Sequence, residues 1–444
     1  MFETVRNAFK VKEIRNKLMF TFVALLIVRL GSQIPLRGVN QAAVAQLLGS
    51  SDAINFFDAL TGGSLMNFSI FALGISPYIT ASIIIQLLTI CIPSLEEMQK
   101  DGEDGRKKIN TYTRYLNVGL SIIQATAMVI GFSNYNGIEI SNATDYIVCI
   151  LALVAGSIFL MWLGEKITER GVGNGISIIL TINIVYKLPQ TARTLWTSYV
   201  SGATNMFNSI IALVVIVALI VGLIFFINLL NGGERRIPVQ YAKKVQGRKM
   251  VGGQTSHIPL KVNTAGVIPV IFASSLMQFP ILIAGFFGVQ PATGKAASFG
   301  QKMLYLLNQS SWFNIKSLSH FKYTLGLVIY IALLIFFAYF YTTITFNPME
   351  VSNNMKKQGG FVPGIRPGKP TTDFLTRVLN SIVLIGAVGL AIIAVIPIIC
   401  SGIFGAQLNF GGTSLIIIAG VILETLKQIE SQMLVRHYKG FLND

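Results

Sequence analysis

The chain has 444 residues, of which 52% are hydrophobic and 12% charged, with a formal net charge of +16. A soluble domain carries roughly 25% charged residues, so this chain has too little charge to cover a water-facing surface. Intrinsic disorder is excluded because it requires low hydrophobicity and high charge. The three cysteines, an odd number, argue against a disulfide scaffold. The composition therefore predicts a polytopic membrane protein.

Ten apolar runs are candidate membrane spans, because a spanning helix needs about 20 mostly apolar residues. They cover 18–36, 74–92, 116–133, 147–164, 176–188, 209–230, 264–288, 323–345, 378–400 and 413–429. The clearest run is 209–230, which carries no charge, and the weakest is 176–188, which is short for a full bilayer. A membrane barrel would show alternating segments of about ten residues instead. The continuous runs predict an all-α fold, and the first run lacks a cleavage site, so we expect it to stay as the first helix.

Lysine and arginine predict the orientation, because cytoplasmic loops carry an excess of both. If the N-terminus is cytoplasmic, 27 of the 35 basic residues fall inside and seven outside, counting residues at the end of a span with the adjoining loop. Both termini are then expected in the cytoplasm. The remaining basic residue, Arg29, lies within the first span, where snorkelling or a nearby partner is the expected explanation.

Between the first two spans lies an apolar, glycine-rich segment, 55–71, that is too short to cross a bilayer. Two interpretations stay open from the pattern alone. The segment is either a half-helix that dips back into the protein, which requires shielding of its backbone, or a surface loop.

The second and seventh spans are more polar than the others. The second carries Thr80, Ser82 and Gln86, and the seventh carries Ser274, Ser275 and Gln278. Small and polar residues often serve as helix-packing contacts in membranes. Each span also has a proline near its start, so a seam that can separate is the second interpretation.

Two cytoplasmic loops, 231–262 and 346–377, are basic and also contain proline, glycine and aliphatic residues. Such loops can be simple topology anchors or lipid-binding patches. They can also form a docking surface, and arginine-rich loops are able to bind RNA phosphate.

Catalytic machinery is not expected, nor is a cofactor or a metal site. The three histidines, His257, His320 and His437, fall in loops or the tail and lie far apart in the sequence. A secondary transporter would usually carry ionisable residues at mid-membrane, and Arg29 is the single residue expected to qualify.

Six motifs in order along the chain resemble the SecY family, the pore subunits of the bacterial Sec protein-translocation channel. They are LGISPYITASIIIQLLT, ITERGVGNGIS, GERRIPVQYAKK, VNTAGVIPVIFASS, GGFVPGIRPGKPT and GGTSLIII. The resemblance implies two pseudo-symmetric inverted halves, 1–188 and 209–444, joined by a hinge loop at 189–208, around a central hourglass pore.

The resemblance also implies roles for particular residues. An aliphatic pore ring is expected from Ile75, Ile79, Leu180, Ile184, Ile271 and Ile417. A plug is expected at about 55–70, with Phe57, Leu60, Gly62, Gly63, Leu65 and Phe68. The polar residues of the second and seventh spans become a lateral gate through which signal sequences and nascent helices enter the lipid.

The same resemblance implies partners and a place in the cell. The small subunits SecE and SecG, the SecA ATPase and the ribosome, including its RNA, are the expected partners, the last two docking on Arg235, Arg236, Lys243, Lys244 and Arg366. Other partners are nascent polypeptides and membrane lipids, and the location is the bacterial plasma membrane. The alternatives are a secondary transporter of a small molecule and a membrane scaffold or insertase accessory without a pore.

Overall fold

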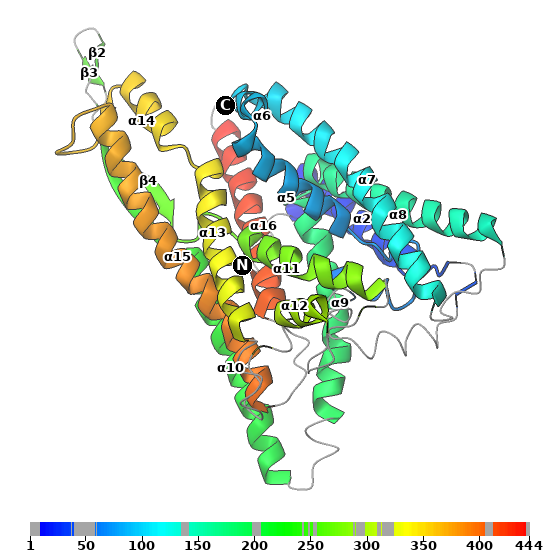
Figure 1. The fold of residues 1–444 in the computed structure, drawn as a ribbon. Helices are drawn as coiled ribbons and strands as arrows, with labels where there is room; N and C mark the ends of the chain where they lie inside the picture. The colour runs from blue at the N-terminus through cyan, green and yellow to red at the C-terminus, as the bar shows by residue number, and fades with distance from the viewer. Residues whose placement is uncertain are drawn as a thin grey trace.

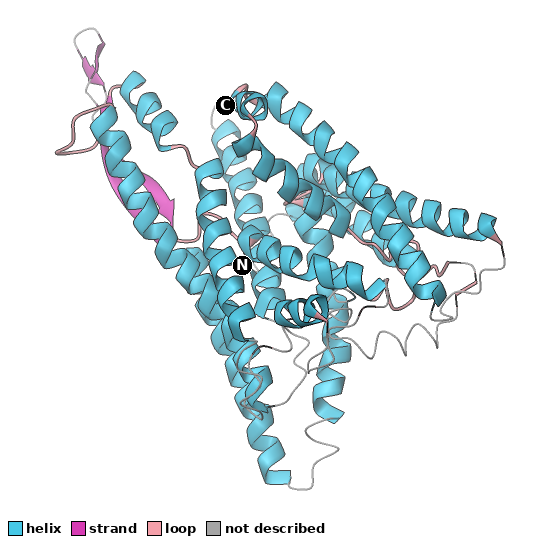
Figure 2. Ribbon diagram, in the orientation of Figure 1, coloured by secondary structure: helices cyan, strands magenta, loops and turns pink. Residues whose placement is uncertain are grey.

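The computed structural model is mostly helical (Figure 1, Figure 2). It describes residues 9–36, 38–39, 58, 60–134, 142–197, 206–241, 244–246, 249–251, 255–286, 289, 298–308, 312, 324–404 and 412–440. Each of the ten predicted spans overlaps a helix of the structure. The apolar runs therefore located the main helices correctly.

The first half of the chain contributes six helices within its described residues. They are α2 (Lys12–Gly31), α5 (Ser76–Cys91), α6 (Pro93–Lys100), α7 (Glu103–Asn134), α8 (Ala143–Arg170) and α9 (Gly175–Trp196). Between α5 and α6 the chain bends by 106° at Ile92. The bend has a local cause, because Pro93 disfavours the helical conformation for the residue before it, and Ile92 is extended.

The second half contributes helices and the strands. The helices are α10 (Met206–Gly232), α11 (Ile268–Phe286), α12 (Phe299–Leu307), α13 (Leu325–Thr345), α14 (Pro348–Lys357), α15 (Lys369–Phe404) and α16 (Gly412–Gly440). The strands are β1 (Glu234–Tyr241), β2 (Lys244–Gln246), β3 (Lys249–Val251), β4 (Thr255–Lys261) and β5 (Gly360–Phe361). Helix α14 begins where the Asn347 side chain accepts hydrogen bonds from the backbone N–H groups of Met349 and Glu350.

Four helices of the described chain are long and apolar enough to cross a membrane: 103–133, 143–170, 325–357 and 369–399. A fifth span results if the bent pair α5 and α6 is counted as one, and 217–232 and 268–281 are shorter apolar helices. The number of ten crossings therefore remains a prediction, although all ten segments are helical. Part of the predicted hinge loop 189–208 is also helical, because α9 continues through Pro189 to Trp196.

The two halves of the chain meet along two seams. On one side α11 contacts α5 and α7, and on the other α16 contacts α9. Within the first half α8 packs on α7, α9 and α2, and within the second half α15 packs on α10, α13 and α16. The main apolar cluster joins side chains from both halves, so the core of the molecule lies where the halves meet.

The basic loops predicted from the sequence are joined in one small sheet. Strand β1 pairs antiparallel with β4 along seven residue pairs, and its end pairs with β5 through Gln240–Phe361 and Tyr241–Gly360. Loops that lie more than a hundred residues apart in the sequence thus form a single body, which projects beside the upper part of α15 (Figure 1). The apolar face of the sheet packs on α14 and α15 through Ile237, Val239, Leu260, Met355, Val362, Leu375 and Val378.

Candidate functional site

The six aliphatic residues predicted to form a ring all belong to the main apolar cluster of the protein. All are buried, with exposed fractions between 2% and 9%, and all belong to one apolar cluster. They come from four segments: Ile75 and Ile79 at α5, Leu180 and Ile184 of α9, Ile271 of α11 and Ile417 of α16. Aliphatic residues from both halves therefore contribute to the same buried cluster.

Helical spacing explains why each pair in this ring points the same way. Ile75 precedes Ile79 by four residues, as Leu180 precedes Ile184, and residues four apart share a helix face. Ile75 is the residue that caps α5, and its carbonyl accepts a hydrogen bond from the backbone N–H of Ile79 at 3.1 Å. The contacts of α11 with α5 and α16, and of α16 with α9, bring the four segments together.

The segment before α5 is packed inside the protein, so the surface-loop interpretation is wrong. Its described residues, 58 and 60–75, are mostly buried. They fold mainly as turns, and helical conformation is restricted to a few residues around Asp58–Thr61, so a continuous half-helix is not found there either. Phe57 of the predicted plug lies outside the described residues, whereas Gly63, Leu65 and Phe68 are buried and Leu60 is half-buried.

Backbone hydrogen bonds attach this segment to the chain that follows α2. The N–H of Leu36 donates to the carbonyl of Phe68 at 3.1 Å, and that of Ile70 donates to the carbonyl of Ile34 at 3.2 Å. Phe68 adopts a positive φ of 43°, which is unusual for a residue with a side chain, and its ring packs edge-on against Phe132 at 4.9 Å between centroids. The buried ring fixes this turn in place.

The polar residues predicted to form a gate lie on two helices in mutual contact, α5 and α11. Thr80 and Ser274 donate to backbone carbonyls of their own helices, at 3.1 Å to Ser76 and 2.7 Å to Val270. Gln86 donates to Ser82 at 3.2 Å, also within α5. The gate residues thus satisfy their donors mostly inside their own helix, and Ser275 is half-buried on α11.

Two glutamines at this seam keep an unsatisfied acceptor. Gln86 Oε1 and Gln278 Oε1 are buried without a hydrogen-bond partner among the described residues, and the Gln278 side chain is 4% exposed. A buried polar atom without a partner is destabilising. Helices α5 and α11 therefore each carry one buried acceptor that destabilises the present packing.

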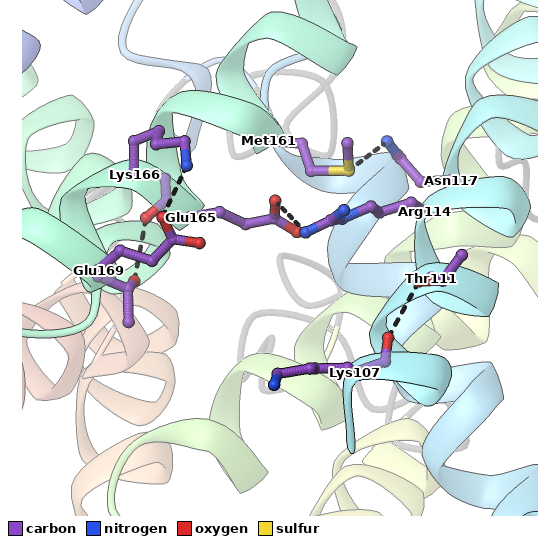
Figure 3. Close-up of polar contacts among 10 residues, drawn as sticks. Lys107, Thr111, Arg114, Asn117, Met161, Glu165, Lys166 and Glu169 are labelled. Atoms are coloured by element: carbon purple, nitrogen blue, oxygen red, sulfur yellow. Dashed lines mark hydrogen bonds and ion pairs between the residues drawn. The ribbon is translucent and has the colours of Figure 1, made fainter. Parts of the chain in front are cut away.

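The neighbouring pair α7 and α8 is bound more firmly (Figure 3). The Arg114 guanidinium makes two bonds to the Glu165 carboxylate, Nη2–Oε2 at 2.9 Å and Nε–Oε1 at 3.0 Å. Asn117 donates to the sulfur of Met161 at 3.2 Å one turn further along. Bidentate arginine–carboxylate pairs fix geometry as well as charge, so α7 and α8 are held as one unit.

Of the residues predicted to bind partners, Arg235 and Arg236 are exposed on β1, and Arg366 is exposed in the turn after β5. Lys243 lies outside the described residues, and of Lys244 only the backbone, in β2, is described. The Arg366 turn is bounded by Gly364 and Gly368, with φ of 81° and 100°, values that favour glycine. Sequence reasoning missed the sheet that joins these loops, although the alternation in IPVQY was its available signal.

This fold, in which two sets of helices meet along an apolar core, is shared with solved protein-conducting channels. A structure described as "The structure of a protein conducting channel" has a TM-score of 0.63 and 18% identity, covering 95% of this chain and 94% of the other. One of "Sec61 in the Canine ribosome-channel complex from the endoplasmic reticulum" has a TM-score of 0.60 and 17% identity with the same coverage.

The chain belongs to the SecY family. The family model SecY matches residues 69–426. The protein translocase subunit SecY of Halalkalibacterium halodurans is 43% identical, that of Bacillus subtilis 42% and that of Thermotoga maritima 38%. Each alignment covers all of this chain and at least 98% of the relative. The resemblance seen in the six motifs is confirmed, and the transporter alternative receives no support.

Proposed function

We propose that this chain is the pore of a protein-conducting channel, which passes unfolded polypeptides across the plasma membrane and releases apolar helices sideways into the lipid. It is not an enzyme. The observation that carries the proposal is the burial of Ile75, Ile79, Leu180, Ile184, Ile271 and Ile417 in one cluster between the two halves. Membership of the SecY family supports the same conclusion.

The chemistry of the ring suits both tasks of such a pore. Aliphatic side chains offer no ligands to an ion, and a narrow apolar constriction excludes water and with it small solutes. The same side chains are mobile about their own bonds and offer a passing polypeptide no specific hydrogen bond. The segment 55–70, whose described residues are mostly buried before α5, is proposed as the plug that fills the space on one side of the ring.

The seam between α5 and α11 is the proposed lateral exit. Its two unsatisfied glutamine acceptors favour separation, because water or a passing peptide N–H can satisfy them once the helices part. An apolar signal sequence that reaches this seam then moves into lipid, driven by burial of its apolar surface.

No energy source is expected in this chain, so a motor or a translating ribosome must supply it. We propose that the joined sheet, with Arg235, Arg236 and Arg366 exposed, is where SecA or ribosomal RNA binds. Related structures include Sec61 in a ribosome–channel complex and a yeast Ssh1 complex bound to the 80S ribosome. SecE and SecG are the expected small subunits of the complex.

A crosslinking experiment tests the pore directly. A secretory polypeptide is stalled in vesicles that contain the assembled complex, and single cysteines are placed by Ile79→Cys or Ile271→Cys. The outward-facing Leu229→Cys on α10 serves as the control, since that side chain is 60% exposed. Adducts at both ring positions and none at the control are expected. Adducts confined to other sites would contradict the pore.

A further inference from the structure

Arg29, the basic residue inside the first predicted span, is half-buried and binds protein groups of two other segments. Its guanidinium donates from Nη1 to Asn183 Oδ1 at 3.0 Å and from Nη2 to the carbonyl of Gly62 at 2.9 Å. It also lies over the ring of Tyr186, 4.0 Å from the centroid. Arg29 therefore connects α2, the segment before α5 and α9.

Asn183 completes this connection from the side of α9. Its Oδ1 accepts from Arg29, and its Nδ2 donates to the carbonyl of Leu60 at 3.1 Å. The side chain is buried. Two carbonyls of the proposed plug, those of Leu60 and Gly62, are thus held by two polar side chains from different helices.

A buried ion pair adds to these contacts one turn further along α9. Lys187 pairs with the carboxylate of Asp58, whose side chain is 1% exposed. The other carboxylate oxygen of Asp58 accepts from the backbone N–H of Met66 at 2.8 Å, which closes the segment on itself. A buried charge that loses its partner is strongly destabilising.

The backbone of the segment is shaped to fit against these groups. Gly62 has a φ of 69°, and a Cβ there would lie 2.5 Å from Arg29 Nη1 and 2.9 Å from the Cα of Asn183. Only glycine allows this close approach, so the contact depends on the sequence of the segment as well as on the two helices.

The contacts lie beside the aliphatic ring. Leu180, Asn183, Ile184 and Lys187 fall at positions i, i+3, i+4 and i+7 of α9, which share one helix face. The polar groups of α9 that bind the segment therefore lie on the same helix face as Leu180 and Ile184, and Lys187 lies one turn beyond them. A displacement of the segment away from the ring has to break them.

We propose that Arg29, Asn183, Lys187 and Asp58 form a polar latch that holds the segment 58–66 under the ring and keeps the idle channel closed to ions. The proposal rests on the function proposed above, in which this segment is the plug. The latch is stable while the segment is in place, because its polar groups then bind protein groups at fixed positions. Once a polypeptide displaces the segment, water enters and hydrates the released cations, which makes opening all-or-none.

The first experiment measures ion leak through idle channels, using vesicles that contain the full complex and a halide-quenched dye. The variants are Arg29→Met and Lys187→Met, with Arg15→Met on the exposed face of α2 as the control. We expect the leak to rise about tenfold in the two latch variants and to stay unchanged in the control. In Lys187→Met the buried Asp58 carboxylate loses its partner, and in Arg29→Met the Gly62 carbonyl and Asn183 Oδ1 lose their donor. A leak within the control's range in both latch variants overturns the latch.

The reversed pair separates loss of the latch from loss of the fold. The double variant Asp58→Lys with Lys187→Asp restores opposite charges, so its leak is expected to fall well below that of Lys187→Met alone. A double variant that leaks at least as much as Lys187→Met contradicts the pairing. Translocation of a secretory protein by the unaltered channel is measured in the same vesicles. If the unaltered channel translocates normally and the latch variants do not leak, the latch alone is overturned. If the unaltered channel does not translocate, the proposed function is overturned together with the latch.

A crosslink provides an independent test that does not depend on weakening the protein. In a chain whose native cysteines are replaced by alanine, Asp58→Cys and Lys187→Cys are joined with a short bismaleimide. The joined channel is expected to remain tight and to lose translocation, while the same variant without the reagent translocates. Equal translocation with and without the crosslink contradicts a segment that must leave the latch.

Discussion

The two seams between the halves differ in how well their polar groups are satisfied. At the α5–α11 seam, Gln86 and Gln278 each keep a buried oxygen without a partner among the described residues. On the α16 side, Lys17 of α2 donates to Gln432 of α16 at 3.3 Å, a hydrogen bond that joins the two halves. Separation of α5 from α11 would therefore expose acceptors that are now unsatisfied, whereas separation on the α16 side would break a hydrogen bond.

Charging the ring between the seams has the largest expected effect. Ile271→Glu places a carboxylate among aliphatic side chains, which destabilises a protein by several kcal/mol unless the charge finds a partner or water enters. We expect lower stability together with a strong ion leak, measured by thermal unfolding in detergent and by dye quenching in vesicles. Ile271→Val is the control, and a tight, stable Ile271→Glu channel would contradict the dry ring.

Overpacking the contact between Gly173, before α9, and α16 has the next largest expected effect. Gly173 precedes α9 with a φ of 79°, and a Cβ there would lie 2.8 Å from Thr425 Oγ1 of α16. Gly173→Ala combines backbone strain with overpacking, for an expected loss of about 2–3 kcal/mol in the free energy of unfolding. Gly102→Ala is the matched control, since its φ is 76° and nothing lies within 4 Å. Equal losses in the two variants would remove the role of the α16 contact.

Removing the unsatisfied acceptor of Gln278 tests the contact between α5 and α11. Gln278→Leu replaces a buried amide by an apolar side chain of similar size, so we expect the free energy of unfolding to rise by about 1 kcal/mol. Lateral release of an apolar segment should become slower, which is followed by crosslinking to lipid over time. Gln358→Leu, at an exposed position, is the control. A destabilised Gln278→Leu would mean that the oxygen has a partner in the membrane.

The smallest effect is expected from a single bond on the α16 side. Lys17→Met removes the half-buried hydrogen bond to Gln432, which contributes about 0.5–1 kcal/mol. The change should lower the thermal midpoint slightly and leave the ion leak unchanged. An increase in leak comparable with that of Arg29→Met would show that this side also opens.

The apolar runs predicted where the main helices lie but not how far they extend. Helix α7 begins at Glu103 instead of 116, and α15 begins at Lys369 instead of 378. The added turns are polar, and a hydropathy run ends where charged residues begin even though the helix continues. The position at which a helix begins depends on helix-forming residues and packing, and a search for apolar windows measures neither.

The burial of the six predicted ring residues in one cluster could be expected from the sequence, whereas the contacts of Arg29, Asn183 and Lys187 could not. Ile75, Ile79, Leu180 and Ile184 have helical spacing and match a known family. Asn183 and Lys187 share their face of α9 but give no local signal, because their partners lie more than a hundred residues earlier at Leu60 and Asp58. Arg29 was noticed as an exception within a span, and only the fold supplies its partners.

The union of β1 with β5 has a mechanical consequence. The sheet is attached through apolar contacts to the beginning of α15, a helix of 36 residues and therefore about 54 Å long. Helix α15 in turn contacts α10, α13 and α16. A partner that tilts the sheet would also tilt α15, because the two are packed together. The movement would then reach α16, the helix of Ile417, through its contacts with α15.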